Sequence, residues 1–332
     1  MTVTVTLLFL TTWGSNGVFA GSQKFTWRIA TKMPPESTEG QAFSLFARRA
    51  EELSNGRLKM LVFPSEQLGD IQTSLEMLRA GTIQMYLEAA ANFHIYVPGF
   101  DVLHLPYLIT SREKLVEFFA SPLVEEWREE LRKKYGVRFL GELGKFVRGP
   151  WRCLIATKPV LSLQDVQGLK LRMFRSEAYQ AAWEYLGADT IILPWTEIYE
   201  ALKRGMIEGA TSPIGLVRGM KFYEAAKYLM RTNEYSQSLT FAMNDKNWEE
   251  LPPDLQKALV QAYNEACEFT QKVMYKEAEV AIKDMVENEG VTFIWLPNTT
   301  LNEFKEKLMP LYEKWAKEKK YGLTEEILKV LR

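Results

Sequence analysis

Two arginines interrupt apolar segments in the middle of the chain, where a positive charge needs a partner. Arg152 precedes the apolar run 153–156, and Arg172 lies inside the strand-like run 168–172. Burying an unpaired charge is costly, so each guanidinium requires either a carboxylate of the protein or an acidic ligand. Its planar fork can bind a carboxylate through two hydrogen bonds. If neighbouring strands bring both arginines to one cleft, they form an anion clamp; pairing with protein carboxylates is the alternative.

The residues that enzymes use most often are scarce. The chain has only two histidines, His94 and His104, and it contains no HExxH, CxxC, GxSxG, GxGxxG or P-loop pattern. Both histidines are expected to be structural, although Cys153 beside a histidine would make a nucleophile pair. Asp245 and Glu249 fit an exposed helical turn better than a hydrolytic dyad. We therefore expect a binding protein with no catalytic residue, no metal site and no cofactor.

Composition excludes several other classes of protein. The 332 residues carry a net charge of -1, with 47% hydrophobic and 25% charged residues, as in ordinary globular proteins. A nucleic-acid surface would require a clustered basic excess, which is missing. Two cysteines, Cys153 and Cys267, give no disulfide scaffold. No run after the first 20 residues reaches the ~20 apolar residues of a membrane span, so we do not expect a membrane-embedded protein.

The first 20 residues resemble a secretory signal. A short apolar stretch begins at residues 7–10, and small residues end it at 17–20, which predicts cleavage after Ala20 and export to the periplasm. The positive charges that usually precede such an apolar stretch are missing. The alternating Val and Thr of residues 2–6 would also suit a buried strand.

Strand and helix patterns alternate along the first two thirds of the chain. Alternating Phe, Trp and Ile predict a strand at 25–30, and a helix at 42–53 stops at Ser54-Asn55-Gly56. This β-α-β order continues and then recurs, which predicts two α/β lobes with mixed, mostly parallel sheets flanked by helices. The further strands are expected at 58–63, 82–87, 137–140, 153–157, 171–173 and 190–193, and the further helices at 71–80, 177–186 and 197–204. Trp27, Trp127, Trp183 and Trp295 lie in these periodic segments or in similar ones, so we expect them in the core.

The last third is helical. Residues 253–288 contain no glycine and no proline after the first position, and Pro252-Pro253-Asp254 marks a helix start. One continuous helix would be about 50 Å long, which is enough to run across both lobes. Two helices with an unmarked break are the alternative.

Six sequence fragments, taken in order, resemble the substrate-binding subunits of tripartite ATP-independent periplasmic (TRAP) transporters, of the dicarboxylate and sialic-acid-binding type. The resemblance covers residues 25–315, nearly the whole chain after the signal. Each fragment is weak alone, and their order is what makes the resemblance specific. The fragments are FPSEQLGD (63–70), LPY (105–107), SLQDVQGLKLR (162–172), PWTEIY through GMIEG (194–209), KFYE (221–224) and LPPDLQ (251–256).

The resemblance implies a two-lobed periplasmic binding protein that closes over a small organic acid and delivers it to TRAP membrane subunits. It implies that Arg172 binds the ligand carboxylate, that Arg152 assists it, and that Trp195 walls the site. Lobe I would comprise residues 21–149 and about 238–277, and lobe II residues 150–237 and about 278–332. Lower-ranked site candidates are Lys32, Glu88, Phe93, Arg148, Arg175, Ser212 and Tyr235.

The chain also departs from the family pattern. Residues 210–213 read ATSP where relatives have QENP, so Ser212 replaces an asparagine and offers a single hydroxyl. Ala89 stands where sialic-acid binders have an acidic residue, one place after Glu88. We therefore expect an acid that is less hydroxylated than sialic acid. Two rival functions stay open, namely a periplasmic sensor for a receptor kinase and an enzyme acting through Cys153.

Overall fold

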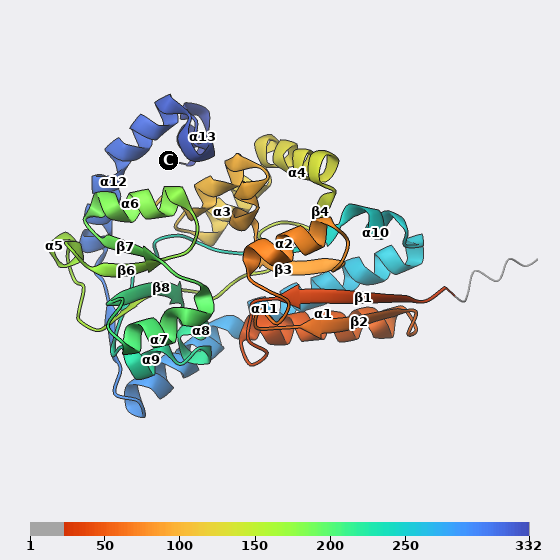
Figure 1. The fold of residues 1–332 in the computed structure, drawn as a ribbon, viewed down its shortest axis with the longest axis horizontal. Coiled ribbons are helices and arrows are strands. Elements are labelled where there is room, and N and C mark those ends of the chain that lie inside the picture. The colour runs from red at the N-terminus through yellow and green to blue at the C-terminus, as the bar shows by residue number, and fades with distance from the viewer. Residues whose placement is uncertain (1–22, 332) are drawn as a thin grey trace, which may run out of the picture.

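The computed structural model describes residues 23–331, so the predicted signal at residues 1–20 lies outside the described residues. Two sheets organise the chain, one on each side of Figure 1. The first sheet has the strand order β2-β1-β3-β10-β4, and the second has the order β11-β9-β5-β8-β6-β7. The strands of the first sheet are β1 (Phe25–Thr31), β2 (Leu58–Phe63), β3 (Met85–Ala89), β4 (Val137–Leu140) and β10 (Leu239–Asn244). Those of the second are β5 (Arg152–Ala156), β6 (Lys170–Met173), β7 (Asp189–Ile192), β8 (Gly209–Pro213), β9 (Tyr228–Arg231) and β11 (Thr292–Trp295).

Both sheets are mixed, as the sequence predicted. In the first sheet β1 runs parallel to β2 and β3, whereas β10 is antiparallel to both of its neighbours. In the second sheet β5 is likewise antiparallel to both of its neighbours, β8 and β9. Each antiparallel strand follows a segment that comes from the other sheet. Two connecting segments therefore pass between the sheets, residues 141–151 and 232–238, and they pair through a bridge between Val147 and Ser238.

Helices cover both sheets. The N-cap Ser37 of α1 accepts a hydrogen bond from the Gly40 amide, and the apolar face of this helix buries Phe43 and Phe46 against Phe241 of β10. The helices of the first 150 residues are α1 (Thr38–Leu53), α2 (Ile71–Arg79), η1 (Ala90–Ile95), η2 (Pro98–His104), α3 (Arg112–Phe119) and α4 (Pro122–Tyr135). Those of the middle are α5 (Leu163–Val166), α6 (Glu177–Leu186), η3 (Trp195–Glu197), α7 (Ile198–Lys203), α8 (Ile214–Gly219), α9 (Phe222–Ala225) and α10 (Asp245–Glu249).

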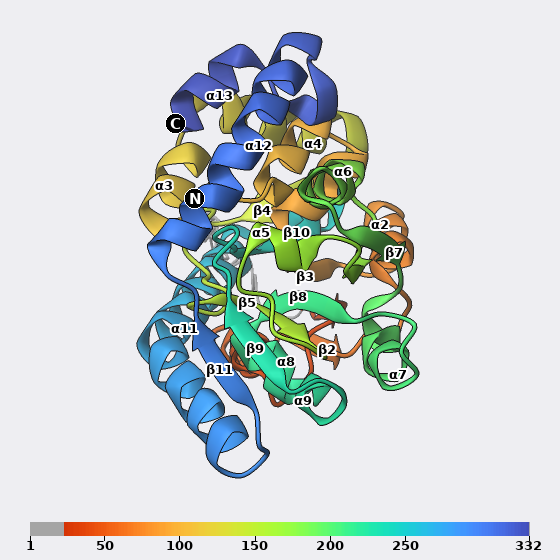
Figure 2. The same ribbon diagram turned by 90° about the vertical axis from the view of Figure 1, so that its left-hand side faces the viewer.

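A single long helix joins the two halves. α11 (Pro253–Glu287) is continuous over 35 residues, so the alternative of two helices is wrong. It packs along α1 beside the first sheet (Figure 1) and lies beside β11 of the second (Figure 2), and it also contacts α8. Within residues 23–331, no helix is both long enough and apolar enough to cross a membrane.

The C-terminal helices connect the halves a second time. α12 (Asn298–Glu318) packs against α6, and Tyr312 on it donates a hydrogen bond to the Pro106 carbonyl at 2.8 Å. η4 (Lys320–Gly322) contacts η2, and α13 (Glu325–Leu331) contacts α3. These last residues, expected with lobe II, thus pack on elements that were expected in lobe I.

One of the four tryptophans expected in the core is exposed. Trp27, Trp127 and Trp183 are buried as expected, but the side chain of Trp295 is 57% exposed. The reason is topological, because β11 is the edge strand of the second sheet and has a neighbour on one side only.

Gly141, just after β4, provides a test of packing between the connecting segment and α11. Its φ is +69°, and an added Cβ would overlap the ring of Tyr263 on α11. We expect Gly141→Ala to lower the free energy of unfolding by about 2–4 kcal/mol, because left-handed strain and steric overlap add. Gly136→Ala is the matched control, since Gly136 has φ +66° and no neighbour within 4 Å. Urea unfolding of both variants measures the difference, and equal losses would contradict the predicted overlap.

Candidate binding site

A cavity of about 230 Å³ lies between the two halves and is lined by residues from both. Its walls come from α2, η1 and η2 on one side, and from β6, β8 and the segment after β7 on the other. The lining is rich in cations, with Lys32, Arg148, Arg152, Arg172 and Arg175 facing Glu66 and Asp70. Because lysines and arginines outnumber carboxylates in the lining, this cavity can bind an anion.

Arg172 faces this cavity without a carboxylate partner. It lies in β6, where it pairs with Ile191 on one side and Ala210 on the other, and it is only 6% exposed. Its Nε donates to the Leu193 carbonyl at 3.0 Å, and its guanidinium lies 5.6 Å from the centre of the Trp195 ring. No ion pair joins it to any acidic residue among residues 23–331. Burial lowers the pKa of Arg172 to about 10, which leaves it charged at neutral pH. The cavity therefore contains a buried positive charge with free donors.

Arg152, at the start of β5, does have a carboxylate partner. Its Nε donates to Glu234 at 3.0 Å, and its other nitrogens donate to Thr211 at 2.9 Å and Gln237 at 3.2 Å. The ring of Tyr235 lies 4.2 Å from its guanidinium carbon. Glu234 is fully buried, so this ion pair is shielded from water. The sequence left two readings for each arginine, and the structure pairs Arg152 with the protein but not Arg172.

Arg148 is a second cation without an ion pair. It lies on the connecting segment 141–151, lines the cavity and is 4% exposed. Its Nε has no hydrogen-bond partner among the described residues, and burial lowers its pKa. The sequence ranked this residue low because its side chain could equally have been solvated. Only the return of residues 232–238 alongside this segment encloses it.

Lys32 and Glu88 form a buried pair at the edge of the cavity. The Nζ of Lys32 lies 3.0 Å from Glu88 Oε1, which also accepts hydrogen bonds from Asn92 at 2.9 Å and the Ala89 amide at 2.8 Å. Lys32 and Asn92 line the cavity, whereas Glu88 is fully buried behind them. Glu88 thus neutralises Lys32 and is not itself exposed to a ligand.

Of the remaining predicted site residues, two line the cavity and two do not. Trp195 and Tyr235 line the cavity. Ser212 and Phe93 do not: Ser212 donates to the Pro213 carbonyl at 3.1 Å, and Phe93 packs against Phe139 at 4.8 Å. Successive residues of a strand point to opposite faces, so Thr211 of β8 faces the cavity and Ser212 points away.

Several lining residues escaped the sequence analysis. Asn92, Gln72 and Gln237 provide amides from elements far from residue 212, so the cavity is not as poor in amides as the ATSP segment suggested. His94 and His104, expected to be structural, also line it. Thr211 could have been found by strand alternation once Ser212 was considered. The others could not, because they are brought together only by folding.

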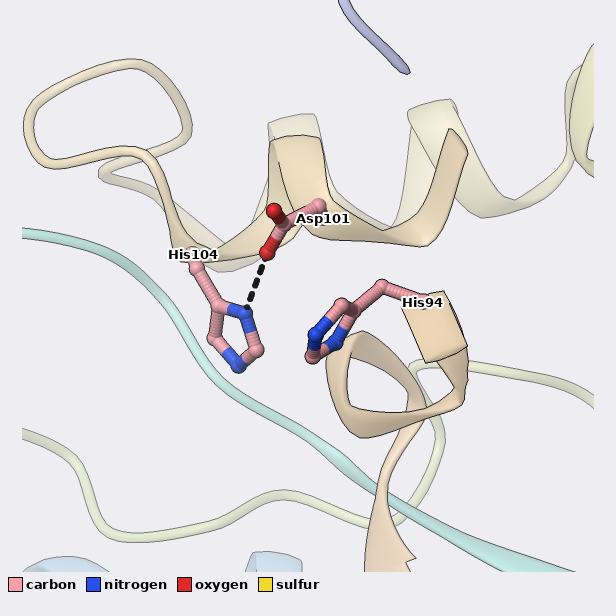
Figure 3. A group of neighbouring side chains, drawn as sticks. All are labelled: His94, Asp101 and His104. Atoms are coloured by element: carbon pink, nitrogen blue, oxygen red, sulfur yellow. Dashed lines mark hydrogen bonds and ion pairs between the residues drawn. The ribbon is translucent and has the colours of Figure 1, made fainter. Parts of the chain in front are cut away.

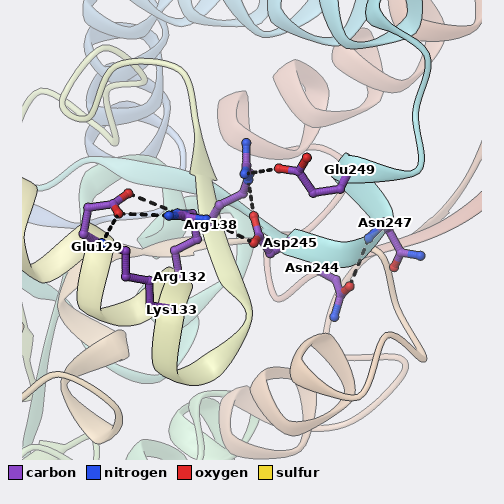
Figure 4. Close-up of polar contacts among 8 residues, drawn as sticks. All are labelled: Glu129, Arg132, Lys133, Arg138, Asn244, Asp245, Asn247 and Glu249. Atoms are coloured by element: carbon purple, nitrogen blue, oxygen red, sulfur yellow. Dashed lines mark hydrogen bonds and ion pairs between the residues drawn. The ribbon is translucent and has the colours of Figure 1, made fainter.

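The residues considered for catalysis lie elsewhere. Asp245 and Glu249 both bind Arg138 of β4, at 2.5 and 2.7 Å, at the outer edge of the first sheet (Figure 4). This ion pairing agrees with the prediction that they are not a hydrolytic dyad. Cys153 is fully buried, does not line the cavity, and has its pKa raised by burial. A thiol in that state is a poor nucleophile.

Two sheets around a cationic cavity define a two-lobed binding-protein fold, and comparison with known proteins agrees. The sequence profile of the bacterial extracellular solute-binding protein family 7, DctP, matches residues 29–319. The chain therefore belongs to this family. The membership confirms the resemblance drawn from the six fragments. It also confirms the prediction of a solute-binding protein that is not an enzyme, and nothing supports the sensor alternative.

Relatives and solved structures match over most of the chain. The sialic acid-binding periplasmic protein SiaP of Vibrio cholerae is 26% identical over 94% of each chain. The C4-dicarboxylate-binding periplasmic protein DctP of Rhodobacter capsulatus is 26% identical over 85% of this chain and 84% of its own. A sugar acid-binding protein of Advenella mimigardefordensis, solved with galactonate, has a TM-score of 0.83 at 22% identity and covers 93% of this chain and 98% of its own. A TRAP periplasmic solute-binding protein of Sulfurospirillum deleyianum, solved with succinate, has the same TM-score and identity, covering 93% and 99%. These structures confirm the predicted two-lobed fold.

Proposed function

We propose that this chain is an exported, periplasmic solute-binding protein that captures a small organic carboxylate and delivers it to the membrane subunits of a TRAP transporter. The observation that carries the proposal is the buried guanidinium of Arg172, which has no ion-pair partner and lines the cavity between the two halves. A ligand carboxylate would supply the missing negative charge and accept its free hydrogen bonds. The names of relatives that bind sialic acid, C4-dicarboxylates and sugar acids support the choice of an organic acid.

Each cation of the site has a separate part in this proposal. Arg172 binds the carboxylate directly, with Trp195 holding the guanidinium plane from one side. Arg148 gives a second positive charge within the same cavity. Arg152 assists indirectly, because its partners Thr211 and Gln237 are themselves lining residues that it holds in place.

Capture would proceed by closure of the two lobes about the connecting segments 141–151 and 232–238. We place residues 23–149 and 238–277 in lobe I, and 150–237 with most of 278–319 in lobe II. The C-terminal residues 320–331 pack on η2 and α3, so in this scheme they move with lobe I. Closure excludes water and strengthens the ion pair between Arg172 and the acid.

Thermal unfolding against a panel of acids tests the proposal. The panel contains monocarboxylates, dicarboxylates, keto acids and sugar acids, so that the expectation of a less hydroxylated ligand is tested as well. An acid at 100 times its dissociation constant should stabilise the folded state by about 2.7 kcal/mol, which gives a clear rise in Tm. Mass spectrometry of the denatured protein identifies any acid that co-purified. If no acid raises the Tm and none is released, the carboxylate-binding proposal is wrong.

A further inference from the structure

Two histidines and an aspartate meet at one wall of the cavity. His94 on η1 and both Asp101 and His104 on η2 lie together, each with a ligand atom within 4.8 Å of the others (Figure 3). The two imidazole rings are 5.7 Å apart and nearly perpendicular. Both histidines line the cavity, whereas Asp101 lies behind them. This is the single group of three such side chains found among residues 23–331.

Both imidazoles have a lone pair to donate. The Nδ1 of His94 is 2.9 Å from the Ala91 carbonyl, which can only accept, so Nδ1 carries the proton and Nε2 is free. The Nδ1 of His104 faces Asp101 Oδ1 at 3.0 Å, so its lone pair points at the carboxylate when the proton of the ring is on Nε2. For His94, a hydrogen bond from one nitrogen orients the ring and leaves the other nitrogen available, as is usual for a metal-binding histidine.

Asp101 supplies a buried negative charge with no cationic side chain beside it. Its hydrogen-bond partners are the Ser176 hydroxyl at 2.9 Å and His104 Nδ1 at 3.0 Å, and no lysine or arginine among residues 23–331 forms an ion pair with it. A bound cation would balance this buried charge.

The spacing suits a metal ion. His104 Nδ1 and Asp101 Oδ1 lie 3.0 Å apart, so both can bond one ion at about 2.1 Å, with an angle between the bonds of about 90°, when the ion takes the place of the proton between them. His94 is only half-buried, so its ring has room to approach as the third ligand. Two imidazoles and one carboxylate form a donor set that suits first-row transition metals better than magnesium or calcium, and three protein ligands leave positions open.

We propose that His94, Asp101 and His104 bind a divalent first-row transition-metal ion at the cavity wall, with its open positions turned toward the ligand. The metal site stands independently of the proposed function. Its consequence for that function is that an oxygen of the bound acid completes the coordination.

The test uses tag-free protein dialysed against a chelator, in a buffer without organic acid. Zn²⁺, Ni²⁺ and Co²⁺ are titrated separately by calorimetry, with Mg²⁺ as the hard-cation control. We expect at least one transition-metal ion to bind one per chain, Mg²⁺ not to bind, and Co²⁺ to give a visible ligand-field band. Because no acid is present, this result is independent of whether the carboxylate proposal holds.

Variants assign the site. His94→Gln, His104→Gln and Asp101→Asn should each weaken metal binding by roughly 100-fold or more, since loss even of an outer-shell partner costs ~10–100-fold. Glu66→Gln, which changes another lining carboxylate, should bind metal like the wild type. His94→Gln keeps the test valid if the buried variants fail to fold, because His94 is hydrogen-bonded only to Ala91. The proposal is overturned if none of the three ions binds the wild type, or if His94→Gln binds as tightly.

Discussion

Replacing Arg172 with alanine should nearly abolish binding of the acid that stabilises the wild type. Truncating one partner of a buried, hydrogen-bonded charge pair costs about 2–5 kcal/mol, which is a loss of roughly 30- to 4,000-fold in affinity. The effect should be large because Arg172 is 6% exposed and has no acidic side chain of its own to pair with. Isothermal titration with the acid identified by the panel measures the loss.

The same variant should fold normally, and this separates a binding role from a structural one. An unpaired buried charge does not stabilise the apo protein, so removing it should leave the free energy of unfolding within about 1 kcal/mol of wild type. Arg172→Met is the matched control, since it keeps the aliphatic stem beside Trp195 and removes only the charge. Arg172→Lys keeps the charge but loses the planar fork, so its affinity should fall between those of the wild type and the methionine variant. Equal stabilisation of wild type and Arg172→Met by the acid would show that the carboxylate binds elsewhere.

Replacing Arg152 should instead destabilise the protein itself. Arg152→Ala leaves Glu234 buried and ionised with no cation, and breaking a buried pair in this way costs about 3–5 kcal/mol. Glu234 would keep hydrogen bonds from Tyr179 at 2.9 Å and Thr232 at 2.5 Å, but no opposite charge. Urea unfolding without ligand measures this loss, and the Tm should fall with it.

The double variant Arg152→Met with Glu234→Gln is the control for this prediction. It removes both charges together, so it should recover most of the stability lost in Arg152→Ala. Its affinity for the acid should still be reduced, since Thr211 and Gln237 lose the group that holds them at the cavity. If Arg152→Ala unfolds at the same urea concentration as the wild type, the pair with Glu234 contributes no stability and Arg152 is free to act as a ligand residue.

Much of the fold could be predicted from local patterns. The strand at β2 and the helix α6 have the bounds that the sequence predicted, because alternation, apolar spacing and glycine stops are properties of neighbouring residues. β8 was missed because GATSP has the small and polar composition of a loop, although all five residues are buried. The course of β10 was missed for another reason. It inserts between β3 and β4, although it lies about 150 residues after β3 in the chain. Pairing between such distant segments leaves no local pattern.

The sequence by itself determined the family, the two-lobed α/β architecture and the presence of two arginines in apolar strands. It could not distinguish those arginines, because each has the same local surroundings. That difference depends on Glu234, which lies 82 residues from Arg152 in the chain and reaches it only when β5 and the segment after β9 pack together. The tertiary structure likewise decided that Thr211 and not Ser212 faces the cavity, and that His94 and His104 meet Asp101 there. Charge pairing and metal-ligand geometry depend on distances in space, which spacing along the chain does not fix.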